Sequence, residues 1–138
     1  MAKIKLVFFL FCTFLNAQNR DIDIQHITEL QKLGDSLFKA SNYTDAAKAY
    51  KKLVQIDPNN FDYNFKYASA FGLELEQMPR FKQAKSVREM VKLFERAYEL
   101  DNKNLALNRA LLEIYLRVPR FFGGGDKKAL LIIKNINS

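Results

Sequence analysis

The strongest constraint on this chain is the helical spacing of its apolar residues. From residue 27 to residue 38 they recur three or four positions apart, which places them on one side of a helix. A second stripe with this spacing covers residues 46–56, and Thr44 or Asp45 is expected to cap its helix. Pro58 ends the stripe, because proline cannot extend a helix. The pattern predicts two antiparallel helices joined by a short turn.

The helical hairpin recurs along the chain. Asp57-Pro58-Asn59-Asn60 has a counterpart in Asp101-Asn102-Lys103-Asn104, and the residues before the two turns also correspond. Hairpins repeated at about 34 residues indicate a solenoid, in which each hairpin buries one side against its neighbour. We therefore divide the helical part, residues 27–138, into units 27–60, 61–104 and 105–138.

Residues 27–60 resemble a tetratricopeptide repeat. The positions that carry the resemblance are Leu30, Leu33, Gly34, Leu37, Asn42, Tyr43, Ala46, Tyr50, Ile56, Asp57 and Pro58. Gly34 and Ala46 are expected to let the two helix backbones approach closely, with Tyr43 and Tyr50 filling the space around them. The resemblance implies an all-α, right-handed superhelix of about three helix hairpins. It also implies a non-catalytic module that binds other proteins.

The second and third units depart from the repeat pattern by an insertion each. Met78-Pro79-Arg80-Phe81 delays the second helix of unit 61–104 by about ten residues, and Val118-Pro119-Arg120-Phe121 occupies the same place in unit 105–138. Both insertions are predicted to lengthen the loop between the two helices of a hairpin. Both loops would then lie on one edge of the solenoid.

Residues 1–17 are predicted to be a secretory signal peptide. Two lysines precede an apolar run from residue 6 to residue 15, and Ala17 offers a small residue at the cleavage point. The run is too short for a hydrocarbon layer of about 30 Å, so no stable membrane span is expected after cleavage. Residues 18–26 would form a linker. We therefore expect an exported bacterial protein that is periplasmic or secreted.

Composition excludes several classes of function. The net charge of +7 hints at nucleic acid or an anionic membrane, but two of the lysines belong to the leader. We expect no nucleic-acid partner, because an exported protein rarely meets one.

A single Cys and a single His cannot form a disulfide framework or a usual zinc site. No catalytic set can be assembled without His26, so we predict no enzyme activity, metal or cofactor.

Two further motifs receive structural interpretations. The glycine run 123–125 lacks the Lys-Ser/Thr ending of a phosphate loop, so it is interpreted as a turn, with Asp126 capping the last helix. Five aromatic residues crowd the stretch from Phe61 to Phe71 and are expected to form mainly core. Phe65 is the expected exception, because it aligns with the inner side of the superhelix.

The resemblance also implies which residues line a concave groove. The predicted partner-binding residues are Asp35, Phe38, Lys39, Phe65, Ser69, Arg109, Glu113 and Arg117, with Gln31, Leu73 and Leu116 beside them. This mixture suits an extended peptide or a helix, with apolar contacts for affinity and charges for register. Lys39, Arg109 and Arg117 are candidates to receive a carboxylate.

Two other functions remain open. A small-ligand-binding accessory component of an envelope transporter or assembly machine would need a closed pocket of about 300 Å³ or more, roofed by the two insertions. Self-association is the other, because no further helix covers the isoleucine-bearing outer side of the last hairpin.

Overall fold

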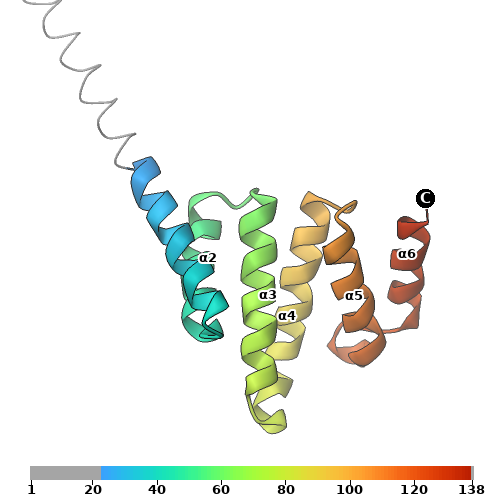
Figure 1. Cartoon of the computed structure of the whole chain (residues 1–138). Helices are drawn as coiled ribbons and strands as arrows, with labels where there is room; N and C mark the ends of the chain where they lie inside the picture. Colours follow the sequence, from blue (N-terminus) through green and yellow to red (C-terminus); the bar gives the residue numbers. More distant parts are fainter. Residues whose placement is uncertain (1–22, 138) are drawn as a thin grey trace, which may run out of the picture.

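The computed structural model describes residues 23–137, and every regular element in this range is a helix. Residues 23–39 are helical and are followed by α2 (Tyr43–Ile56), α3 (Phe61–Gln77), α4 (Arg80–Leu100), α5 (Leu105–Arg117), the 3₁₀ turn η1 (Arg120–Phe122) and α6 (Asp126–Ile136). Successive helices run antiparallel, side by side (Figure 1). The predicted all-α architecture of three hairpins is confirmed over these residues.

The N-terminal predictions fall mostly outside the described range. The expected signal peptide, residues 1–17, and the first part of the expected linker are not among the described residues. Residues 23–26, which we assigned to the linker, already belong to the first helix.

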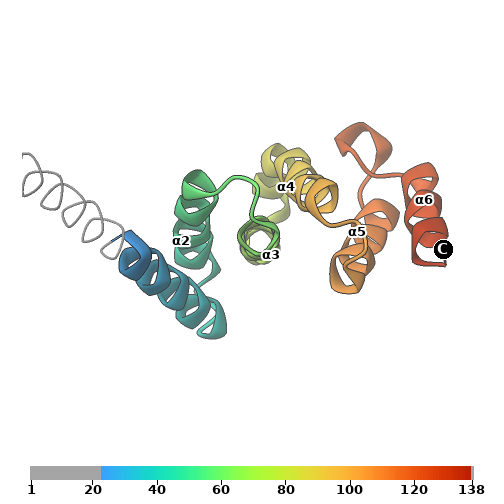
Figure 2. The ribbon, with the colours of Figure 1, turned by 90° about the horizontal axis from the view of Figure 1, so that it is seen from above.

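The helices divide between two sides of the solenoid. Seen from above, residues 23–39, α3 and α5 lie on one side, while α2, α4 and η1 lie on the other (Figure 2). We call the first side the inner face and the second the outer face. Helix α6 closes the C-terminal end of the row.

Asparagine side chains cap the N-termini of three helices. Asn42, Asn60 and Asn104 each accept a hydrogen bond from a backbone N–H in the first turn of the helix that follows. The expected cap at Thr44 or Asp45 is therefore wrong, because Asn42 already occupies the cap position and bonds Asp45 N–H at 3.3 Å. Asp126 is not a cap either, since α6 begins after Gly125 without a side-chain cap.

The repeated turns are built by the same hydrogen bonds. Asn64 donates to the carbonyls of Pro58 and Asn60, and Asn108 donates to those of Asn102 and Asn104. Both amides are buried. The two turns are therefore built on the same pattern of buried hydrogen bonds.

Two apolar clusters form the core. The N-terminal cluster joins residues 23–39, α2 and α3 around Ala46, Tyr50, Leu53, Tyr67 and Ala70. The C-terminal cluster joins α3 to α6 around Ala68, Val91, Phe94, Ala97, Leu107, Leu111, Tyr115, Ala129 and Ile132. Some expected core residues are outside both: Leu33 and Ile56 are 53% and 48% exposed.

Gly34 makes room for a side chain. A Cβ at this position would lie 2.7 Å from Cε1 of Tyr50. The expected close approach thus involves the Tyr50 ring, which is buried against this helix.

The insertion in the second unit does not lengthen a loop, contrary to the prediction. Only Met78 and Pro79 separate α3 from α4, and the extra residues extend these helices to 17 and 21 residues. The reason is local: after Pro79 the chain holds mainly good helix formers and no glycine or proline up to Leu100. In the third unit residues 118–125 do form a long connection, which contains η1.

Candidate functional site

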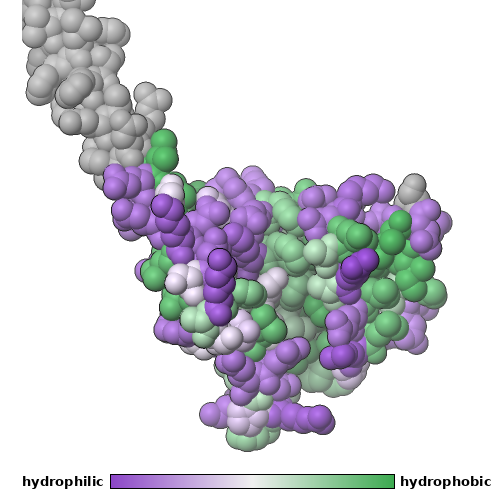
Figure 3. Space-filling view, viewed as in Figure 1, coloured by the Kyte–Doolittle hydropathy of each residue, from purple (hydrophilic) through white to green (hydrophobic). Residues whose placement is uncertain are grey.

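The predicted partner-binding residues lie on the three helices of the inner face. Asp35, Phe38 and Lys39 belong to residues 23–39, whereas Phe65 and Ser69 belong to α3. The remaining three, Arg109, Glu113 and Arg117, belong to α5. Figure 3 shows this side of the molecule, which is hollowed between its two flanks: hydrophilic residues dominate the left flank, apolar residues lie in the hollow, and the right flank carries hydrophobic residues beside hydrophilic ones.

Asp35 connects the first hairpin to the second. Its carboxylate accepts hydrogen bonds from the Tyr50 hydroxyl at 2.7 Å and from Lys66 Nζ at 2.9 Å. Partial burial acts to raise the pKa of Asp35, but the bonds from Lys66 and Tyr50 and the charges of Lys66 and Lys39 outweigh it. The pKa of Asp35 is therefore lowered. Asp35 is part of an internal ion pair and is only partly available to a partner.

Lys66 was not among the predicted site residues. It bridges Asp35 and Asp62, whose carboxylate lies 3.3 Å from Nζ one helical turn away. The Asp62–Lys66 spacing of four residues is visible in the sequence and could have identified the second contact. The first contact joins residues from different hairpins, so only the structure reveals it.

The Asp35 pair makes stability depend on pH in the acid range. Because its pKa is lower in the folded chain than the ordinary value of 3.8, its contribution is complete above that value and is lost as the pH falls through the folded-state pKa. We expect Asp35→Asn to reduce the free energy of unfolding by about 0.5–1 kcal/mol at pH 7, since the pair is partly exposed. Denaturant titrations should show this difference shrinking below about pH 4. A difference that grows with acidification would contradict the assignment.

The two predicted phenylalanines pack into the solenoid. Phe38 meets Tyr43 edge to face, with ring centroids 5.3 Å apart. Phe65, the expected exposed aromatic, stacks on Phe61 at 5.7 Å and meets Phe94 of α4 at 6.3 Å. The long α4 supplies this neighbour, so Phe65 presents only part of its surface. Both rings are half-buried and therefore support the inner face as well as lining it.

The other polar residues predicted to bind a partner differ in how free their side chains are to contact it. Ser69 donates its hydroxyl hydrogen to the carbonyl of Phe65 within α3. Glu113 and Arg117 form an exposed ion pair at 2.7 Å, which is worth little in water and is easily exchanged for a partner's charge. Lys39 and Arg109 are exposed, and neither forms an ion pair within the described part of the chain.

A second charged cluster joins the last two hairpins. Glu95 of α4 accepts hydrogen bonds from the Tyr115 hydroxyl at 3.0 Å and from Lys128 Nζ at 2.6 Å. Lys128 also lies 5.3 Å from the centroid of the Tyr115 ring. Burial, together with the Glu95 charge and hydrogen bond, raises the pKa of Tyr115. The cluster repeats the tyrosine–carboxylate–lysine chemistry of Asp35, Tyr50 and Lys66, and it holds hairpins together.

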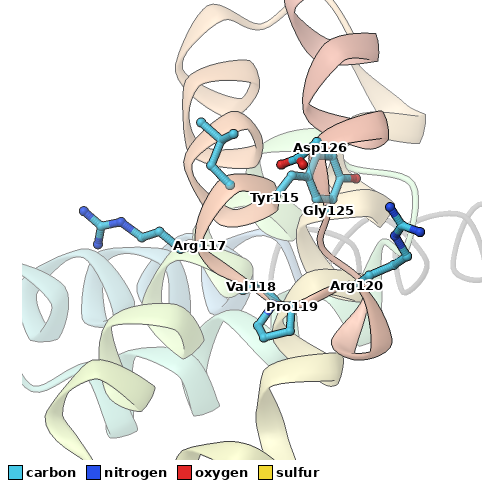
Figure 4. A pocket seen from close by; sticks show the side chains of 8 residues that line it. Tyr115, Arg117, Val118, Pro119, Arg120, Gly125 and Asp126 are labelled. Carbon is cyan, nitrogen blue, oxygen red and sulfur yellow. The ribbon is translucent and has the colours of Figure 1, made fainter.

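An open cavity of about 280 Å³ lies where α5, η1 and α6 meet. Its lining residues are Tyr115, Leu116, Arg117, Val118, Pro119, Arg120, Gly125 and Asp126. In Figure 4 the Arg117 side chain points away from Tyr115 and Asp126, while Arg120 lies on the opposite side. Only the insertion of the third unit borders this cavity. Residues 78–81 of the other Pro-Arg-Phe insertion do not line this cavity.

Two kinds of feature are absent from residues 23–137. No helix in this range is long and apolar enough to cross a membrane. The same residues hold no group of three or more His, Cys, Asp or Glu side chains placed to bind a metal ion.

The fold and the inner face together define a class of protein: a solenoid of stacked helix hairpins with a hollowed face. The family model described as TPR repeat matches residues 34–73, from the first helix through α2 into α3. The match supports a tetratricopeptide repeat over these residues. No curated protein matches the chain.

Proposed function

We propose that this chain is a non-catalytic interaction module whose inner face binds a segment of a partner protein. Tetratricopeptide repeats generally mediate protein–protein interaction and typically serve as scaffolds. The observation that carries the proposal is the hollowed inner face, which has exposed cations on both flanks and the half-buried Phe65 on the helix between them. Apolar contacts in the hollow would supply affinity, and the flanking charges would set the register of the segment.

The charges of the inner face indicate a segment that carries carboxylates. Lys39 stands on one flank, and Arg109 and Arg117 stand on the other. Arginine is suited to carboxylates because its planar fork can donate two parallel hydrogen bonds. We therefore expect acidic side chains or a terminal carboxylate toward the α5 end of the bound segment.

The binding experiment begins with selection of peptides from a random displayed library on the purified chain. The selected peptide is then titrated into the wild type and into the double variant Arg109→Glu with Arg117→Glu. We expect affinity to fall at least tenfold, because each substitution replaces attraction to a carboxylate with repulsion. The matched control, Lys51→Glu with Lys52→Glu, makes the same charge change at exposed positions of α2 on the outer face.

The control separates the proposed site from a general charge effect. Affinity should change less than twofold in the α2 variant, and circular dichroism should show that both variants keep their helices. Unchanged affinity in the α5 variant, or equal losses in both variants, would contradict the proposed site.

We further propose that the module works in the bacterial cell envelope or outside the cell. Support comes from the sequence of residues 1–17, with its two lysines, apolar run and small residue at position 17. The mass of the protein recovered from its own host tests this proposal. A mature chain that begins at Gln18 is expected, and an intact Met1 start in the cytoplasmic fraction would contradict it.

Two alternatives have observations in their favour. The cavity beside Tyr115 is close to the lower size limit of small-ligand sites, and a ligand there would perturb NMR signals of Tyr115 and Asp126 before those of Lys39.

Self-association is favoured by Leu130 and Leu131 of α6, which are 63% and 65% exposed. Light scattering distinguishes a monomer from an oligomer.

A further inference from the structure

The first half of α4 concentrates positive charge on the outer face. Arg80, Lys82, Lys85 and Arg88 follow one another without an acidic residue, and Glu89 is the one acidic residue between positions 77 and 92. These residues belong to the helical extension that distinguishes the second unit from a standard repeat. The extension is thus a basic helical segment rather than a neutral spacer.

One side of this segment combines the cations with an exposed ring. Phe81, Lys85, Arg88 and Lys92 are spaced by four, three and four residues, so they share a side of α4. All four are exposed, and Phe81 retains 77% of its surface. Lys85 and Lys92 form no ion pair among the described residues, so their charges are not neutralised within the fold.

The insertion of the third unit adds a second exposed ring near Arg88. Arg88 donates from Nη2 to the carbonyl of Phe121 at 2.6 Å, which ties η1 to α4. Phe121 is 67% exposed. Figures 1 and 2 both place η1 beside α4, on the side of the molecule away from the inner face. We call Phe81, Lys85, Arg88, Lys92 and Phe121 the basic–aromatic strip.

The shape of the strip indicates what it can bind. Most of the strip follows one exposed side of α4, and none of its residues lines the cavity at the α5–α6 end. An exposed side of a single helix does not enclose a peptide, but it can lie on a flat surface. Exposed aromatic rings enter the interfacial layer of a bilayer, and lysine and arginine bind anionic headgroups while their apolar stems remain buried.

We propose that the basic–aromatic strip docks the solenoid on a bilayer surface that carries anionic lipids. Phe81 at one end of the strip and Phe121 near Arg88 enter the interface, and Lys85, Arg88 and Lys92 contact the headgroups. The inner face then points away from the membrane and stays open to a partner. This peripheral contact needs no membrane-spanning helix, and it does not depend on what the inner face binds.

Vesicle flotation tests the proposal with the full chain. The wild type should float with phosphatidylglycerol–phosphatidylcholine vesicles and much less with pure phosphatidylcholine. One cation near an anionic surface is worth about 1 kcal/mol, or roughly fivefold in partitioning, so Lys85→Glu with Lys92→Glu should lower binding at least tenfold. The variant Phe81→Ser with Phe121→Ser should lower it at least fivefold.

A matched variant on the inner face is the control. Lys39→Glu with Arg109→Glu changes the net charge equally and should alter flotation less than twofold. All variants share the same N-terminal residues, so any contribution from these residues is constant. Equal binding to both vesicle types, equal losses in strip and control variants, or strip-dependent binding to a single-stranded RNA probe without vesicle binding would each overturn the proposal.

Discussion

Replacing Leu111 with alanine should lower the free energy of unfolding by about 3 kcal/mol. Leu111 lies in α5 and is fully buried in the C-terminal cluster, where α4, α5 and α6 meet. Large-to-small changes at such positions lose the transfer energy of the removed methyl groups and leave a cavity, which together cost about 2–5 kcal/mol. Urea denaturation followed by circular dichroism measures the loss.

Leu116, in the same helix, provides the matched control. It is 61% exposed, so Leu116→Ala should change the free energy of unfolding by less than about 0.5 kcal/mol. Similar losses of unfolding free energy in the two variants would contradict the packing described for α5, in which Leu111 is buried and Leu116 is exposed.

Gly124→Ala should destabilise the third hairpin by about 2–3 kcal/mol. A Cβ at Gly124 would overlap the carbonyl oxygen of Val118, which belongs to the backbone and cannot rotate away. The connection between α5 and α6 must then open, and Gly125 N–H would lose its bond to the Tyr115 carbonyl, now 2.8 Å long. Because a solenoid unit contacts only its neighbours, hydrogen exchange should accelerate in α6 before α2.

Gly72 provides the opposite case. It lies within α3, and a Cβ there would meet Phe94 at 3.5 Å, which is an ordinary contact. Gly72→Ala should therefore stabilise the chain by roughly 0.5–1 kcal/mol, the usual gain for this change inside a helix. Equal destabilisation by both substitutions would contradict the packing described for the 118–125 connection.

Much of the fold was predictable from sequence because the information is local. Helical spacing between residues 27 and 56 and the chain-breaking Pro58 identify the first hairpin without any contact from the rest of the molecule. The repeated turns then identify the second and third hairpins. Asn64 and Asn108 could also have been found, since each occupies the same position after its turn and an isolated polar residue on a buried side needs hydrogen-bond partners.

The missed pairings depend on distant residues, whereas the wrong loop prediction has a local cause. The pairing of Asp35 with Lys66 and of Glu95 with Lys128 depends on how hairpins stack, which periodicity along one helix does not reveal. The extension of α4 was mistaken for a loop because the repeat pattern was extended unchanged over residues that strongly favour helix.

The inner face is consequently more constrained than the sequence suggested. Phe38, Phe65 and Asp35 hold neighbouring helices in place, which leaves Lys39, Arg109 and the exchangeable Glu113–Arg117 pair as the groups most open to a partner. A preformed face of this kind loses little side-chain freedom on binding, and this favours affinity. Substitutions at the supporting residues should therefore affect stability together with binding, whereas those at the open cations should affect binding alone.

Site-directed photo-crosslinking tests the central claim most directly. A photoreactive amino acid is placed at one of four exposed positions: Lys39 or Glu113 on the inner face, Lys92 on the outer face, or Leu131 on α6. Each labelled chain is irradiated with the peptide selected from the library. Binding in the hollow predicts cross-links from positions 39 and 113 and none from 92 or 131. Cross-links from 92 or 131, with none from 39 and 113, would show that the peptide binds elsewhere and would contradict the proposed function.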